Sequence, residues 1–74
     1  MNLVRKITIK IDKDNVMHYQ VGSKVFGGAR VVSDIIKEGK FFDIYVREAD
    51  SEIKMIWKSF NIDSVVHIEY ETDL

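Results

Sequence analysis

Apolar and polar residues alternate along much of the chain, and this alternation is typical of strands that bury one face. It is clearest in residues 5–11, where three isoleucines share one side and Lys6, Thr8 and Lys10 share the other. The same two-residue period predicts further strands over residues 16–21, 41–48, 53–58 and 65–71. Short polar turns separate these segments, so neighbouring strands are expected to form hairpins.

Residues 30–36 permit two interpretations. Their four aliphatic side chains fall on one stripe of a helix, yet these side chains are β-branched and favour a strand. The glycine-bearing turn at residues 37–40 has the length of a hairpin loop, and it favours the strand. The alternative is one helix at about residues 29–38, ending at Gly39, which would make the protein α+β.

Six short strands with turns between them predict an all-β protein, an antiparallel meander that curls into a small barrel or a small sandwich. A flat sheet would leave two edges and one face uncovered, so closure or dimerisation is expected. The order of the later elements, a hairpin, an irregular turn at residues 59–63 and a final strand, is similar to the back half of SH3-like barrels. The proline and aromatic motif of peptide-binding SH3 domains is absent, so the resemblance does not imply their ligand preference.

Length and composition indicate a single β-rich domain over residues 1–74. With 46% hydrophobic and 31% charged residues, the chain has apolar material for a core and charge for solubility. A core of this size gives marginal stability, which makes pairing with a second copy one expected partnership. The formal net charge of -1 does not indicate a polyanionic partner.

The residue usage predicts a cytoplasmic protein. The chain has no cysteine for a disulfide, its first ten residues lack the pattern of a signal peptide, and no apolar run is long enough to span a membrane. Abundant Ile, Lys and Asn together with no proline is the usage of AT-rich genomes. We therefore expect an origin in a bacterium, a phage or a mobile element.

The residue types that carry catalysis or bind metals occur without the required spacing. His18 and His67 are expected on outward faces of different strands, with no cysteine to complete a metal site. His67 and Glu69 lie two residues apart on one predicted strand face, so they are expected to be close. The serines fit no nucleophile motif, and Gly27 and Gly28 lack the lysine and the helix of a phosphate loop. We expect a protein that is not an enzyme and that binds no cofactor or metal.

The leading hypothesis is a small protein-binding module that acts through a sheet surface. If residues 41–48 and 53–58 pair as a hairpin, apolar side chains on their outer face form a patch with a basic rim. The candidate interface residues are Phe41, Tyr45, Arg47, Lys54, Ile56 and Lys58.

The alternative hypothesis is a small β-barrel that binds nucleic acid through a basic and aromatic strand face. The first strand and its turn carry the candidate residues Arg5, Lys6, Lys10 and Lys13. The acidic tail that includes Glu69 and Glu71 would oppose phosphate binding unless it lies on another side of the molecule.

Overall fold

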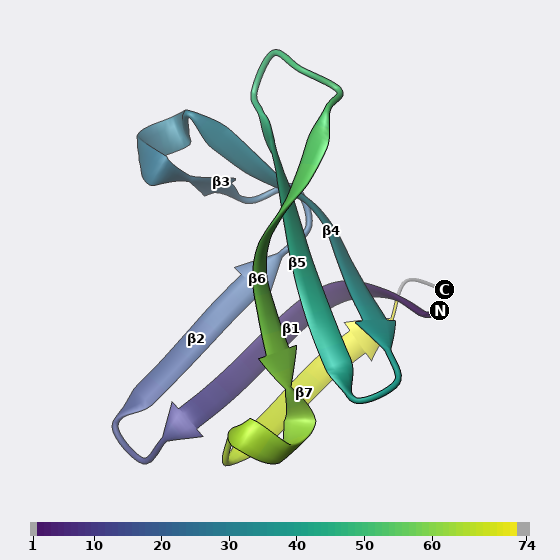
Figure 1. Cartoon of the computed structure of the whole chain (residues 1–74). Coiled ribbons are helices and arrows are strands. Elements are labelled where there is room, and N and C mark those ends of the chain that lie inside the picture. The colour runs from purple at the N-terminus through teal and green to yellow at the C-terminus, as the bar shows by residue number, and fades with distance from the viewer. Residues whose placement is uncertain (1, 73–74) are drawn as a thin grey trace.

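The computed structural model describes residues 2–72 and shows an all-β protein with one antiparallel sheet of seven strands (Figure 1). The strands are β1 (Asn2–Asp12), β2 (Asn15–Gln20), β3 (Lys24–Val25), β4 (Arg30–Glu38), β5 (Phe41–Glu48), β6 (Lys54–Asn61) and β7 (His67–Thr72). Two short 3₁₀ turns, η1 (Phe26–Gly28) and η2 (Ile62–Ser64), complete the elements. Within residues 2–72 no helix is long and apolar enough to cross a membrane.

The ambiguous segment at residues 30–36 is a strand, and the alternative prediction of a helix at about residues 29–38 is wrong. As part of β4, this segment pairs along its length with β5, from Arg30 opposite Glu48 to Glu38 opposite Phe41. It also pairs with β1 and β3, so its backbone groups are satisfied within the sheet. The β4–β5 hairpin turns at Gly39, whose φ of 59° is a conformation that glycine adopts readily. The two-residue strand β3, which lies inside the glycine-rich loop, was not predicted.

The long strand β1 has three partners and organises the sheet. On one edge its first residues pair with β4 and the residues from Lys6 onward pair with β2, whereas on the opposite edge residues from Val4 to Lys10 pair with β7. Hydrogen-bonded neighbours follow the path β2–β1–β4–β5–β6, in which β2 and β4 share one edge of β1, and β7 pairs with the other edge of β1. The predicted meander is therefore correct for β4, β5 and β6 but not for the whole chain.

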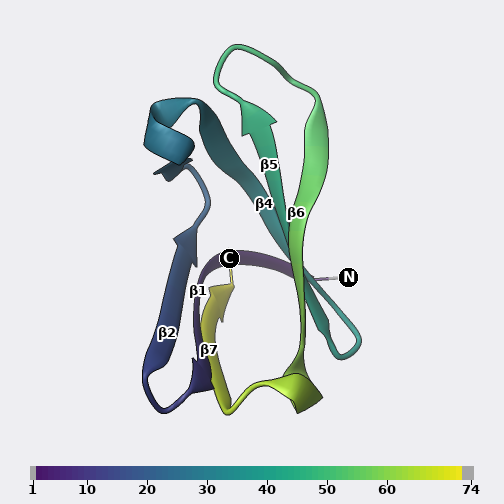
Figure 2. The same cartoon turned by 60° about the vertical axis from the view of Figure 1, so that its left-hand side comes forward.

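The sheet bends so strongly that its two halves cross and face each other (Figures 1 and 2). One half is β2–β1–β7 and the other is β4–β5–β6, and both contribute to a single core. The fully buried core side chains are Val4, Ile7, Ile9, Val32, Ile35, Phe42, Ile44 and Val46, with Tyr19 nearly buried. Because most of these residues occupy the apolar parity of the predicted strands, alternation correctly identified most of the core.

The sheet remains open, and the expected closure into a barrel is not found. Over the described residues, β6 pairs only with β5 and β7 pairs only with β1. After β6, the side chain of Asn61 accepts a hydrogen bond from the backbone N–H of Asp63 and so caps η2. This turn leads the chain away from β6, which leaves β7 with one unpaired edge.

Candidate protein-binding surface

The outer face of β4–β5–β6 brings together the two central residues of the predicted interface. Tyr45 on β5 lies directly opposite Ile56 on β6, and both point away from the core. Directly opposed residues on one face of a sheet are in side-chain contact. The sequence therefore predicted this pair and its outward direction correctly.

The structure extends this pair into a longer apolar row. Leu3 on β1 lies opposite Ile36 on β4, and Ile36 lies opposite Asp43, two residues from Tyr45 on β5. Ile36 and Tyr45 are therefore diagonal neighbours on the outer face. We call Leu3, Ile36, Tyr45 and Ile56 the outer stripe. Leu3 is 55% exposed and Ile56 is 54% exposed, so the stripe presents apolar surface across four strands.

Polar pairs border the outer stripe on both sides. On one side the Lys54 ammonium lies 2.7 Å from a carboxylate oxygen of Asp34, and this ion pair spans from β6 to β4. On the other side the Ser59 hydroxyl donates a hydrogen bond of 2.6 Å to Asp43. An apolar centre with a polar rim is the usual anatomy of a protein interface.

Two of the predicted interface residues lie on the outer face but outside the stripe. Arg47 donates hydrogen bonds to the carbonyls of Glu48, Ala49 and Ser51, so it holds the β5–β6 loop together. Phe41 is exposed at the start of β5, four residues from Tyr45, which corresponds to about 13 Å along a strand. Arg47 lies opposite Lys54, diagonal to Ile56, whereas Phe41 lies opposite Asn61 and is not a neighbour of Ile56.

Lys58 lies on the opposite face from the one predicted. The β5–β6 register shifts between Ile44 and Tyr45, so a bulge places Lys58 opposite the buried Ile44. Its ammonium donates a hydrogen bond of 3.1 Å to the Tyr19 hydroxyl and lies 4.7 Å from the centre of the Trp57 ring. Simple alternation cannot detect a bulge, which explains the error.

Lys58 belongs to a group of aromatic and cationic side chains that sequence reasoning missed. We call Tyr19, Phe26, Arg30, Trp57 and Lys58 the aromatic–cation cluster. Their rings meet in series, with 5.5 Å between the centres of Tyr19 and Trp57 and 5.2 Å between those of Trp57 and Phe26. The Arg30 guanidinium lies over the exposed Phe26 ring. Phe26 has φ of 55°, a left-handed conformation that is strained for a bulky residue.

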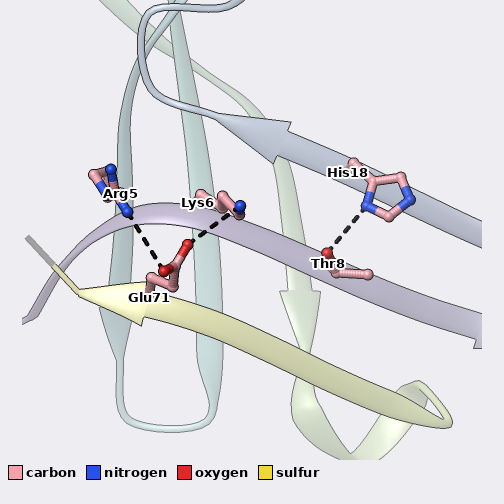
Figure 3. Close-up of polar contacts among 5 residues, drawn as sticks. All are labelled: Arg5, Lys6, Thr8, His18 and Glu71. Carbon is pink, nitrogen blue, oxygen red and sulfur yellow. Dashed lines mark hydrogen bonds and ion pairs between the residues drawn. The ribbon is translucent and has the colours of Figure 1, made fainter.

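The predicted basic face of β1 is partly neutralised. Glu71 on β7 forms ion pairs with both Arg5 and Lys6, at 3.4 and 3.3 Å (Figure 3). Lys10 lies opposite His67, while Lys13 is exposed in the β1–β2 turn. The acidic residues of β7 thus lie beside the basic residues of β1 rather than on another side, which weakens this face as a phosphate-binding surface.

Both histidines lie on the outer face of β2–β1–β7. The ring of His18 shares a hydrogen bond of 3.0 Å with the Thr8 hydroxyl (Figure 3). His67 lies 3.3 Å from Glu69, as their spacing predicted. No group of three or more histidine, aspartate and glutamate side chains in the described part of the chain is arranged to hold a metal ion.

The β1–β2 turn is organised by Asp12. Its carboxylate accepts hydrogen bonds from the backbone N–H groups of Asp14 and Asn15 and from the Asn15 side chain. These bonds, that from the Asn15 side chain most of all, lower the pKa of Asp12 below its ordinary value of 3.8. The polar turn predicted at this position therefore has a specific physical basis.

Comparison of the chain with protein-family models, with curated proteins and with solved structures finds no match. Its function is therefore inferred from its own residues.

Proposed function

We propose that this protein is a non-enzymatic binding module that associates with a second copy of itself through the outer stripe. The observation that carries the proposal is the continuous apolar row from Leu3 to Ile56 on a face that no described element covers. Exposed apolar rows with polar rims favour protein contacts. A chain of 74 residues also gains stability from burying a further apolar face.

Charge at the border of the stripe permits a second copy as the partner. Along one side of the stripe, the Lys54 ammonium lies 2.7 Å from a carboxylate oxygen of Asp34, so these two charges are already paired within one copy. Two stripes can pack face to face about a two-fold axis across their middle, and this ion pair then brings no unpaired charge against the second copy. The contact therefore avoids opposition of like charges at this border.

The size of the outer stripe sets the expected affinity of self-association. Four adjacent strands span about 15 Å, since neighbouring strands lie about 4.8 Å apart. A contact of this width is at the small end of specific interfaces, so we expect a dissociation constant on the order of 100 µM.

Analytical ultracentrifugation over a range of concentrations tests the proposal. The wild-type protein should show a mass that rises toward twice the monomer mass, whereas Ile56→Glu should remain monomeric. The matched control is Ile53→Glu, which changes another exposed isoleucine in the β5–β6 loop, outside the stripe. A monomeric wild type at about 1 mM, or equal association of Ile56→Glu and wild type, would overturn the proposal.

We also propose an SH3-like relationship, a cytoplasmic location and an origin in a phage or mobile element. The SH3-like relationship is supported by the order of the hairpin β5–β6, the turn η2 and the strand β7, which returns to pair with β1.

A second candidate function is binding of single-stranded nucleic acid. We place its site at the aromatic–cation cluster instead of the β1 face. The exposed ring of Phe26 offers a surface for base stacking, and Arg30, whose guanidinium lies over that ring, offers charge for phosphate. Binding to a mixed-sequence oligonucleotide should fall steeply with salt and should be weakened by Arg30→Gln but less by Lys54→Gln. No detectable binding at about 50 mM salt would exclude this candidate.

A further inference from the structure

The strand β7 has one edge without a strand partner among residues 2–72. Its other edge pairs with β1 over six positions, from Val4 opposite Thr72 to Lys10 opposite His67. The backbone N–H and C=O groups along an unpaired edge can accept another strand. This edge lies at the opening of the sheet, beside the turn η2 (Figure 2).

An apolar groove runs beside this edge. We call it the seam groove, and it has a volume of about 350 Å³. Its walls include Lys37, Phe42, Ile62, Val66, Ile68 and Tyr70. The Tyr70 ring packs against Phe42 with 5.1 Å between ring centres, yet Tyr70 is 43% exposed and Val66 is 65% exposed. Apolar side chains are thus presented next to backbone groups that can form a ladder.

The residues of β7 alternate in a way that specifies a complementary strand. Ile68 and Tyr70 line the seam groove, whereas Glu69 and Glu71 point to the outer face. The partner that β7 already has shows which pattern fits: on β1, Lys6 lies opposite Glu71 and Ile7 opposite Tyr70. A strand with alternating basic and apolar residues matches both faces of β7.

We propose that the unpaired edge of β7 binds an extended segment of a partner protein in which apolar residues alternate with lysine or arginine. The backbone of the segment extends the sheet, and its apolar side chains enter the seam groove. Its basic side chains face Glu69, because Glu71 already forms ion pairs with Arg5 and Lys6. This site is separate from the outer stripe, and the proposal does not depend on self-association.

A second copy of β7 fits this edge poorly. In the two antiparallel registers that overlap most while keeping outer-face residues on the same face, Glu69 of one copy lies opposite Glu69 or Glu71 of the other. Like charges directly opposed across two strands are destabilising. The negative charges of Glu69 and Glu71 therefore favour a basic segment over a second copy of β7.

A peptide with the sequence of residues 5–11, Arg-Lys-Ile-Thr-Ile-Lys-Ile, is the direct probe because this segment already pairs with β7 inside the molecule. Its control replaces both lysines with glutamate. Fluorescence anisotropy should show binding of the basic peptide about tenfold tighter than the acidic one. Hydrogen exchange should slow at β7 amides when the basic peptide is bound.

Protein variants locate the site. Glu69→Lys should weaken binding of the basic peptide several-fold, whereas Glu52→Lys, which changes an exposed acid in the β5–β6 loop, should leave it unchanged. Ile56→Glu should also bind the peptide as wild type does, so failure of the outer-stripe proposal and failure of this one are distinguishable. Equal binding of the two peptides, no effect of Glu69→Lys, slowed exchange only outside β7, or self-association that β7 variants abolish would each overturn the proposal.

Discussion

Lys58 and Tyr19 are joined by a hydrogen bond of 3.1 Å that links β6 to β2 across the core. The two residues are 39 positions apart in the chain, and their contact depends on the bulge that turns Lys58 inward. The Tyr19 hydroxyl also donates to the sulfur of Met17, 3.5 Å away, so this nearly buried oxygen has two partners. The contact connects the two halves of the open sheet.

This link should be measurable as a coupling energy. Lys58→Met keeps the apolar stem but removes the charge, and it should lower the free energy of unfolding by about 1 kcal/mol. In a double-mutant cycle with Tyr19→Phe, measured by urea unfolding, we expect a coupling of about 1 kcal/mol. The control is Lys54→Met, which breaks an exposed ion pair and should change stability by about 0.5 kcal/mol. A coupling near zero would show that Lys58 and Tyr19 act independently.

The left-handed conformation of Phe26 predicts an unusual order of stabilities. Because its φ is 55°, Phe26→Gly should be about 1 kcal/mol more stable than Phe26→Ala. Both variants should shift the fluorescence of Trp57, the single tryptophan, to longer wavelength since its ring loses the contact with Phe26. At the neighbouring Ala29, whose φ of -70° suits any residue, Ala29→Gly should instead be destabilising. Greater stability of Phe26→Ala than of Phe26→Gly would contradict the presence of backbone strain at Phe26.

The β1–β2 turn should lose stability in acid. The pKa of Asp12 lies below 3.8 in the folded protein, so its carboxylate contributes stability above the unfolded value, and this contribution is lost as the pH falls through the folded pKa. The stability difference between wild type and Asp12→Asn should therefore be largest above about pH 4 and shrink below it. Chemical denaturation at several pH values measures this difference. The control is Asp14→Asn in the same turn, and an Asp12→Asn difference that does not vary with pH would contradict the expected effect.

Local patterns predicted most strands because each depends on neighbours in the sequence. Residues 5–11 and 41–48 alternate without interruption, and their inward residues Ile7, Ile9, Phe42, Ile44 and Val46 form much of the core. The inward position of Lys58 could not be predicted, because a bulge adds one residue and reverses the parity that follows.

Only Tyr45 and Ile56 of the outer stripe could be predicted from the sequence, for a related reason. Tyr45 and Ile56 belong to one hairpin, so their pairing follows from the turn between them. Leu3 and Ile36 come from strands far apart in the sequence, and the β1–β4 register that aligns them has no local signal. The ion pairs of Arg5 and Lys6 with Glu71 were missed because they depend on the equally distant pairing of β1 with β7.

Methyl NMR spectra recorded on dilution test the outer stripe most directly, because they locate the contact without a substitution. Between about 1 mM and 20 µM, the methyl signals of Leu3, Ile36 and Ile56 should move together and fit one dissociation constant on the order of 100 µM. The methyl signals of Ile53, in the exposed loop, and of Ile44, in the core, should stay in place. Unchanged stripe signals over this range, or movement of Ile53 equal to that of Ile56, would contradict self-association through the stripe.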